Sequence, residues 1–422
     1  MTEHILDELA WRGLISQTTG DDELREHLSA GPVTLYCGFD PTAPSLHIGN
    51  LVQILTVRRF QDAGHMPLLL VGGATGLIGD PKMSGERTLN PVDVVHSWVE
   101  RIRAQIEPFM RFDGDNAARM VNNYDWTRDL SAIELLRDVG RYFRMGTMLS
   151  KDTVARRLNS EEGLSFTEFS YQVLQGMDFL ELYRRYGCTL QTGGSDQWGN
   201  LTSGTDLTRK AEGVSVHALS TPLITKADGT KFGKTESGTV WLDPELTSPY
   251  AFYQFWLNQA DADVISYIKV FTFLGREEID ELERSVATEP FKREAQRRLA
   301  WEVTSLVHGA DAAQGAVDAS AALFGRGELS ALDAATLAGV AKELGGAESG
   351  PNVTIAEAFV DAGVVESKGA ARRAVQESGA YVNNAKVDDA DAALSTIAPL
   401  AGGWYVLRRG KKTTGLLRLV AA

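Results

Sequence analysis

Three polar side chains recur at helical spacing on one predicted helix. Between Ser165 and Leu180, Tyr171, Gln175 and Asp178 stand at positions i, i+4 and i+7 and therefore share one helix face. A solvated stripe is the usual explanation of such spacing. Because the flanking residues are apolar, a buried polar row that hydrogen-bonds a ligand is at least as good an interpretation. The segment therefore offers a candidate binding surface.

The stretch from Tyr36 to Asn50 is a second candidate, with chemistry that suits phosphates. A short apolar run at 33–39 predicts a strand, two prolines end it, and 49–63 carries apolar residues at helical spacing. A strand–turn–helix unit brings backbone N–H groups and a positive helix end to the strand's carboxyl edge. We therefore expect a phosphate-binding site here.

Three further loops carry candidate ligand-binding residues. Two are rich in glycine, Gly72–Pro81 with Asp80 and Gly193–Asn200 with a carboxylate and an amide, and the third, Lys226–Thr235, holds three lysines. Glycine allows close approach of the backbone to a ligand, but Gly72–Pro81 matches neither G-x-G-x-x-G nor a Walker motif. Taken alone, Gly72–Pro81 could be merely a tight crossover, and Lys226–Thr235 could be an inert surface loop.

The elements that must position these residues alternate between strand and helix. Strand 33–39, helix 49–63 and strand 67–72 form a β-α-β unit, which implies a parallel sheet. Further strands are expected at 189–192 and 221–225, with a helix at 200–211 between them, and residues 1–30 have the pattern of an amphipathic helix. The fold class predicted is α/β, with a Rossmann-like parallel-sheet catalytic domain.

Composition shifts along the chain divide it into domains. We expect a catalytic domain at 1–248 with a mainly helical insertion at about 122–164, and an α-helical domain at 249–325. An Ala/Gly-rich linker follows at 326–350, although residues 332–344 could form a helix. Residues 351–422 have the size of a small separate domain.

Composition also restricts the class of protein. The 422 residues are 43% hydrophobic and 23% charged, the two cysteines are too few for a disulfide scaffold, and the acidic start lacks the features of a signal peptide. We therefore expect a cytoplasmic protein without a membrane span. The net charge of −14 argues against nucleic acid as a partner, but residues 351–422 carry nine Lys/Arg against seven Asp/Glu. Those residues are thus +2, and the rest of the chain is −16.

Two short motifs together resemble a known enzyme class. His47-Ile-Gly-Asn50 and Lys231-Phe-Gly-Lys234-Thr235 are similar to the HIGH and KMSKS signatures of class I aminoacyl-tRNA synthetases. The segments around Tyr36, Gly72–Pro81, Tyr171–Asp178 and Gly193–Asn200 narrow the resemblance to the family of bacterial tyrosyl-tRNA synthetases. It runs along nearly the whole chain, and residues 353–415 resemble the S4-type RNA-binding domain of that family.

The resemblance implies an activity and its partners. L-tyrosine would react with ATP to give tyrosyl-adenylate and pyrophosphate, and tyrosine would then pass to the 3′ end of tRNA(Tyr). Mg²⁺ would enter with ATP as substrate, with no protein-bound metal or prosthetic group. A helical anticodon-binding domain, an S4-like α+β domain and a homodimer joined through the insertion are also implied.

The resemblance further assigns roles to individual residues. The catalytic set, which handles the phosphates, is His47, Asn50, Lys231, Lys234 and Thr42. The tyrosine-binding set is Tyr36, Asp80, Tyr171, Gln175, Asp178 and Gln197. The ATP-binding set is Cys37, Gly38, Asp40, Gly49, Gly194, Asp196 and again Lys234. Lys82 and Arg87 are weaker candidates for the phosphate region, with exposed surface residues as the alternative.

One position departs from the family pattern. The fourth residue of the first signature is Asn50 instead of histidine, so it can donate a hydrogen bond but cannot carry a positive charge. Two rivals follow from the same residues. The first is another adenylating enzyme of the same architecture. A tryptophanyl synthetase would not need paired partners for a phenol hydroxyl, and a small-molecule nucleotidyltransferase would not need an S4-like domain. A noncatalytic RNA-binding protein of synthetase ancestry, such as a splicing factor, would not need His47, Asp80 and the lysines.

Overall fold

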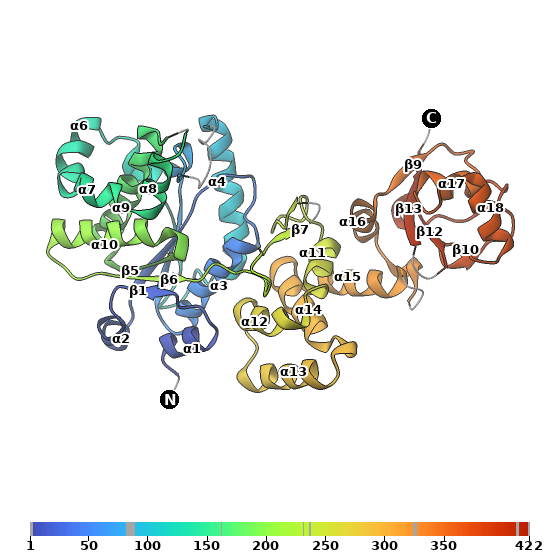
Figure 1. The fold of residues 1–422 in the computed structure, drawn as a ribbon, viewed down its shortest axis with the longest axis horizontal. Helices are drawn as coiled ribbons and strands as arrows, with labels where there is room; N and C mark the ends of the chain where they lie inside the picture. The colour runs from blue at the N-terminus through green and yellow to red at the C-terminus, as the bar shows by residue number, and fades with distance from the viewer. Residues whose placement is uncertain are drawn as a thin grey trace. The chain divides into compact units, whose positions relative to one another are not determined.

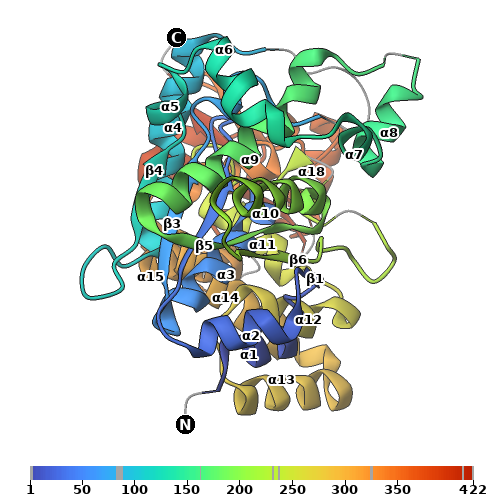
Figure 2. The same ribbon diagram turned by 90° about the vertical axis from the view of Figure 1, so that its left-hand side faces the viewer.

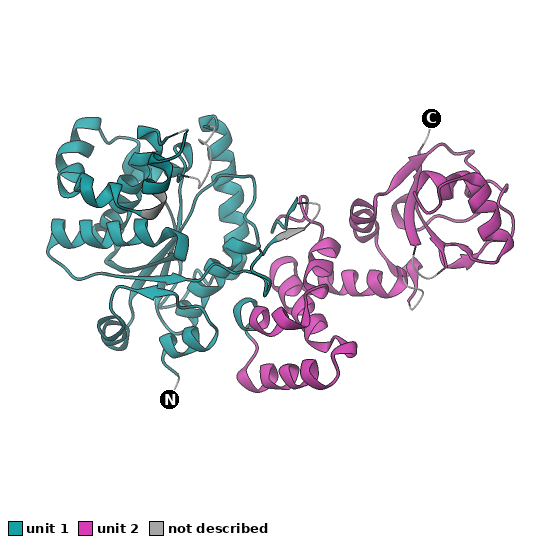
Figure 3. Cartoon of the chain, viewed as in Figure 1, with its two compact units in different colours: residues 1–242, 269–273 teal, residues 243–268, 274–422 magenta. Residues whose placement is uncertain are grey.

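The chain forms two compact units. The computed structural model describes residues 3–81, 89–161, 163–230, 232–235, 238–323, 327–410 and 413–420. The first unit comprises residues 1–242 and 269–273, and the second comprises 243–268 and 274–422 (Figure 3). Among the described residues, no helix is both long and apolar enough to cross a membrane.

A six-stranded sheet forms the centre of the first unit. Its order is β1 (Gln17–Thr18), β6 (His217–Thr221), β5 (Cys188–Gly194), β2 (Thr34–Phe39), β3 (Met66–Val71) and β4 (Arg119–Asn122). All neighbours are parallel except β1, which pairs antiparallel with β6. The predicted Rossmann-like parallel sheet is thus confirmed. Strand order reverses between β2 and β5, the switch point at which open α/β sheets bind ligands.

Helices cover both faces of this sheet. The helices α3 (Ile48–Asp62) and α4 (Val92–Ile106) lie on one side, and α9 (Phe166–Tyr186) and α10 (Trp198–Glu212) lie on the other (Figure 1). The Ser165 hydroxyl caps the start of α9 by accepting from the Glu168 N–H, and α9 ends at Gly187 in the left-handed conformation. These two caps fix where α9 begins and ends, and so they fix the position of its polar row along the helix.

Three predicted elements differ from the structure. Residues 1–30 form two helices, α1 (Ile5–Trp11) and α2 (Asp21–Ser29), because Gly13 and Gly20 with positive φ interrupt the pattern. The strand predicted at 221–225 is wrong: β6 spans 217–221 and ends before Pro222, which cannot donate to a ladder. Strand β4 was missed within a stretch that had a mainly helical pattern.

Short helices follow β4 in the region predicted as an insertion. They are α5 (Tyr124–Thr127), α6 (Ala132–Glu134), α7 (Met145–Leu149) and α8 (Asp152–Leu158). Figure 2 shows α6, α7 and α8 near α9 and α10. A buried ion pair fixes the connection from α8 to α9, since Arg157 donates to both carboxylate oxygens of Glu168 at 2.9 and 3.2 Å.

Helices dominate the first part of the second unit. They are α11 (Pro249–Leu257), most of α12 (Asp261–Phe271), α13 (Arg276–Thr288), α14 (Glu294–His308) and α15 (Ala310–Leu323). Within the stretch predicted as a linker, α16 (Ala334–Leu344) begins at a side-chain cap from Asp333 and packs against α11, α15 and β13. This is the helical alternative that the sequence left open.

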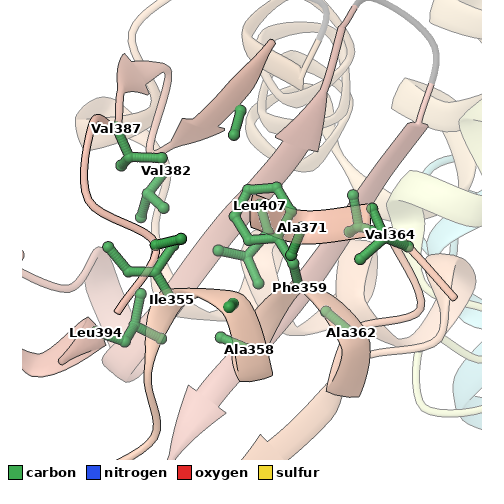
Figure 4. Close-up of a cluster of buried hydrophobic side chains, with 14 of the residues drawn as sticks. Ile355, Ala358, Phe359, Ala362, Val364, Ala371, Val382, Val387, Leu394 and Leu407 are labelled. Atoms are coloured by element: carbon green, nitrogen blue, oxygen red, sulfur yellow. The ribbon is translucent and has the colours of Figure 1, made fainter. Parts of the chain in front are cut away.

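The C-terminal residues from β9 to β13 form a small α+β fold, a sheet with two helices packed on it, which we call the C-terminal layer. Its sheet has the order β11 (Ala385–Lys386), β10 (Ala380–Val382), β12 (Trp404–Arg409), β13 (Thr413–Leu419) and β9 (Ala347–Ser349). Helices α17 (Ile355–Asp361) and α18 (Lys368–Gln376) pack on it around Phe359, Leu394 and Leu407, all of them almost fully buried (Figure 4). The layer thus has its own hydrophobic core.

Candidate active site

A polar cleft opens at the carboxyl edge of the sheet, where strand order reverses. It has a volume of about 410 Å³, and residues from β2, β3, β5, α3, α9 and their following loops line it. The lining includes Tyr36, Cys37, Gly38, Asp40, Thr42, His47, Gly49, Asn50, Asp80, Tyr171, Gln175, Asp178, Gly194, Asp196 and Gln197. Residues singled out from separate stretches of sequence therefore meet at one cleft.

Tyr36 is a buried residue of the cleft lining. Its hydroxyl donates to Gln191 Oε1 at 3.0 Å, and its ring packs 5.4 Å from that of Phe179. Gln191 faces Tyr36 because the two residues are register partners in β2 and β5. The Gln191 amide nitrogen donates in turn to the Leu201 carbonyl, so its oxygen is turned toward Tyr36. A hydroxyl with a fixed neighbour thus projects into the cleft.

Asp178 is a buried carboxylate that lines the same cleft as Tyr36. Its two oxygens accept from Trp126 Nε1 at 2.9 Å and from Asn123 Nδ2 at 3.0 Å. Burial raises the pKa of Asp178 to about 7, while these two hydrogen bonds oppose the rise. The carboxylate can therefore change protonation state near neutral pH.

Hydrogen bonds link Asp178 to a second carboxylate. Asn123 Nδ2 also donates to the Thr75 hydroxyl, which donates to Asp40 Oδ1 at 2.7 Å. The other oxygen of Asp40 accepts from the Tyr171 hydroxyl at 2.7 Å. Gly72 leaves room for this network, since a Cβ there would collide with Asp40 Oδ1. Asp178, Asp40 and Tyr171 thus belong to one hydrogen-bonded network.

A third carboxylate, Asp80, faces the helix α10 side of the cleft. It accepts from Gln197 Nε2 at 2.9 Å and from Asn200 Nδ2 at 3.1 Å. Two other acceptors of the cleft, Gln175 Oε1 and Thr192 Oγ1, are buried and have no hydrogen-bond partner among the described residues. Buried acceptors of this kind normally have a partner. A bound ligand with N–H donors could supply the missing hydrogen bonds to these two oxygens.

The first signature motif forms the start of α3. His47 is the N-cap: its Nδ1 accepts from the Gly49 N–H at 3.0 Å, and Asn50 Oδ1 accepts from the His47 N–H at 3.1 Å. Because Nδ1 accepts, the neutral imidazole carries its proton on Nε2. Desolvation lowers the pKa of His47 and favours this neutral form. Asn50 fills the capping-box position, and its amide N–H₂ is not used by the cap.

The remaining predicted residues fall into three groups. Cys37 is buried, its pKa is raised to about 12 by burial, and it lines the cleft with Gly38, Gly194 and Asp196. Lys234 lies in β7 (Lys234–Thr235), which pairs with β8 (Gly238–Thr239) in a short hairpin. Lys231, Lys82 and Arg87 lie outside the described residues.

Four residues that hydrogen-bond to side chains of the site were not singled out from the sequence. Asn123 and Trp126 follow the missed strand β4, so recognising that strand would have placed them at the binding edge of the sheet. Thr75 lies inside the glycine-rich loop, and its hydroxyl could have been recognised there as a possible hydrogen-bonding group of the site. Gln191 had no local signal, because its importance depends on its register with Tyr36.

Comparison with known proteins identifies the class to which this fold and cleft belong. The family described as class I tRNA synthetases for tryptophan and tyrosine matches residues 28–325. The chain is therefore a class I aminoacyl-tRNA synthetase. A second family, described as the C-terminal domain of tyrosine–tRNA ligases, matches residues 340–417.

Individual relatives define the branch of that class. The tyrosine–tRNA ligase of Streptomyces avermitilis is 64% identical over 97% of this chain and 97% of its own length, and that of Streptomyces coelicolor is 61% identical over 99% of both. A C-terminally truncated mitochondrial tyrosyl-tRNA synthetase of Aspergillus nidulans is a structural neighbour, with a TM-score of 0.70 and 31% identity over 76% of this chain and 94% of that one. The chain belongs to the tyrosine–tRNA ligase family.

Proposed function

We propose that the protein activates L-tyrosine with ATP and transfers the tyrosyl group to the 3′ end of tRNA(Tyr). The observation that carries this proposal is one continuous cleft at the strand switch point. Its lining brings together the buried side chains of Tyr36 and Asp178 and the capped start of α3. In the first step a tyrosine carboxylate oxygen attacks the α-phosphorus, the bond to the bridging oxygen breaks, and pyrophosphate leaves.

The hydroxyl–carboxylate pair would select the side chain of the amino acid. The phenol O–H donates to ionised Asp178, and the Tyr36 hydroxyl turns its proton from Gln191 to the phenol oxygen. Phenylalanine would leave both groups without partners in a buried site, which is why it is rejected. Tyrosyl-tRNA synthetases are themselves the standard example of this rule, in which a site built for a hydroxyl excludes the analogue that lacks it.

The other polar groups would hold the backbone of the amino acid. The Asp80 carboxylate, the Tyr171 oxygen and the unsatisfied Gln175 Oε1 suit a substrate ammonium group, which has three N–H donors. Gln197 lies beside Asp80 on the side where the substrate carboxylate would approach. This arrangement would bring that carboxylate toward the α-phosphate.

The start of α3 would bind the phosphates of ATP. His47 Nε2 and the Asn50 amide are neutral donors at a positive helix end, and Gly49 and Thr42 line the same part of the cleft. Lys231 and Lys234 supply positive charge to the β- and γ-phosphates as the transition state forms. Cys37, Gly38, Asp40, Gly194 and Asp196 take the ribose side, and Mg²⁺ would enter with ATP.

Asn50 would serve as a donor without acting in proton transfer. Its oxygen completes the helix cap, so only the amide N–H₂ is available to a phosphate oxygen. This division of the side chain suits asparagine, since a neutral amide carries an acceptor and two donors.

The partners beyond ATP and tyrosine follow from the other parts of the chain. Residues 351–422, with their net charge of +2, would add affinity for tRNA as an S4-like domain, and the helices at 249–325 would bind the anticodon region. Exposed apolar residues of the insertion and the start of α9, among them Ile133, Leu136, Met145 and Phe166, suit a homodimer interface. Because the reaction uses tRNA and ATP, we propose that it takes place in the cytoplasm.

The test is tyrosine-dependent exchange of pyrophosphate into ATP by the purified protein. Tyrosine should support exchange, and phenylalanine and tryptophan should not. Absence of exchange, or equal exchange with phenylalanine, would refute the assignment.

A further inference from the structure

A short segment far along the chain is built into the first unit. Residues 269–273, which include the last turn of α12, belong to the unit formed by residues 1–242. Arg12 Nη1 donates to the Lys269 carbonyl at 2.8 Å, and Arg59 Nη2 donates to the Val270 and Thr272 carbonyls at 3.0 and 2.7 Å. The segment is therefore held by two cations at the negative end of a helix.

Burial makes these contacts strong. Arg12 and Arg59 are each only 5% exposed, and the Arg59 guanidinium also stacks on the Phe273 ring at 4.9 Å. Charge-assisted hydrogen bonds are stronger than neutral ones, and a buried guanidinium that loses its acceptors is costly. Since Arg59 lies on α3, the helix that starts next to His47 also fixes the position of residues 269–273.

The same segment contacts the second signature motif. Phe271 is fully buried, and its ring lies 5.5 Å from that of Phe232, with 31° between the ring planes. Phe232 stands directly after Lys231 and two residues before Lys234. The residue that makes this aromatic contact therefore stands, in the sequence, between the two lysines that we propose bind the phosphates.

The next residue of the lysine loop, Gly233, packs against the first signature motif. Gly233 has φ +86°, and a Cβ there would lie 3.0 Å from Ile48 Cγ1, so glycine suits this position against the first residue of α3. The Val240 N–H donates to the Gly233 carbonyl at 3.1 Å, and the Ile48 N–H donates to the Val240 carbonyl at 3.2 Å. Two neighbouring residues of the loop are thus packed, Phe232 against Phe271 and Gly233 against Ile48.

We propose that Phe271 is a positioning residue for the reaction. Its ring sets the place of Phe232 and with it the approach of the Lys231–Lys234 loop to the phosphates of ATP. The alternative is that Phe271 only fills the core. The two roles differ in what they change: a core role affects stability alone, whereas a positioning role lowers the rate of tyrosine activation in a folded enzyme. This inference rests on the proposed tyrosine activation.

The test compares Phe271→Leu with Phe109→Leu, a matched loss of a buried ring in the same unit, away from the cleft lining. In pyrophosphate exchange, Phe271→Leu should lower kcat roughly 3- to 10-fold, the range that loss of one aromatic pair represents. The KM for tyrosine should stay within about twofold of the wild-type value, because the tyrosine-binding residues are unchanged. Phe109→Leu should leave both constants nearly unchanged.

A double-mutant cycle distinguishes loss of the contact between Phe271 and Phe232 from a general disturbance of the structure. Phe232→Leu should lower kcat to a similar degree, and the double variant should lose little more than the larger single loss, because both changes remove one contact. Equal behaviour of Phe271→Leu and Phe109→Leu, or losses that simply multiply, would overturn the inference. If Phe271→Leu does not fold, Phe232→Leu decides alone: an unchanged kcat would refute the role. A wild-type protein without exchange would instead refute the proposed function.

Discussion

Replacement of Asn123 should move the pH dependence of tyrosine binding. Asn123 is fully buried and donates to Asp178 Oδ2 at 3.0 Å, and this hydrogen bond holds down a carboxylate pKa that burial raises to about 7. A hydrogen bond to a charged group contributes about 1.5–3 kcal/mol, which corresponds to about one to two pKa units. In Asn123→Ala the pKa of Asp178 should therefore rise to about 8–9.

The sign of the effect follows from which form binds the phenol. The ionised carboxylate accepts the phenol proton, so affinity is present above the pKa of Asp178 and falls as the pH drops through it. For the wild-type protein the KM for tyrosine should rise as the pH falls below about 7. For Asn123→Ala the same rise should begin about one to two pH units higher.

The measurement is the KM for tyrosine in pyrophosphate exchange from about pH 6 to about pH 9.5 at saturating ATP. Asn122→Ala is the matched control, because Asn122 Oδ1 accepts from the Gly73 and Tyr124 N–H groups and not from a group that contacts Asp178. An unshifted midpoint in Asn123→Ala, or the same shift in Asn122→Ala, would refute the reasoning.

Three other properties can be tested on the same protein. Burial lowers the pKa of His65 to about 4, and its Nδ1 accepts from the Val33 N–H, so protonation should cost about 2 kcal/mol of unfolding free energy at about pH 5 relative to about pH 7.5. Urea titrations of wild type and His65→Gln at both pH values check this, and an equal loss in the variant would contradict it. A chain ending at Gly345 should keep pyrophosphate exchange within about twofold and lose about tenfold or more in tRNA charging, since phosphate contacts supply much of RNA affinity; loss of exchange would disprove the separate roles. Phe166→Asp, at a residue 77% exposed in the single chain, should weaken a homodimer by about 3 kcal/mol or roughly 100-fold, and unchanged sedimentation at micromolar concentration would argue against that interface.

Local patterns carried much of the fold and the site. The spacing of Tyr171, Gln175 and Asp178 lies within one helix, so it was legible without tertiary information, and all three residues line the cleft. The strand–turn–helix around His47 was equally local. Strand β2 was predicted to within one residue of its observed start, because a proline-bounded apolar run is a strong signal.

Properties that depend on pairing across the chain were not predicted. Gln191 reaches Tyr36 only because β2 and β5 are neighbours in a particular register. Strand β4 is four residues long and begins with arginine and ends with asparagine, so its burial pattern is weak and Asn123 went unnoticed. The contact of Phe271 with Phe232 joins positions that no sequence period relates.

The segment 269–273 also bears on how the gene could be divided. The catalytic unit is discontinuous in sequence, since residues 243–268 of the second unit separate its two parts. A fragment that stops at residue 248 would leave Arg12 and Arg59 buried without the carbonyls that accept from them. A catalytic fragment designed to keep these contacts has to extend past Phe273. The first unit therefore cannot be separated by a single cut in the chain, whereas the C-terminal residues have a hydrophobic core of their own.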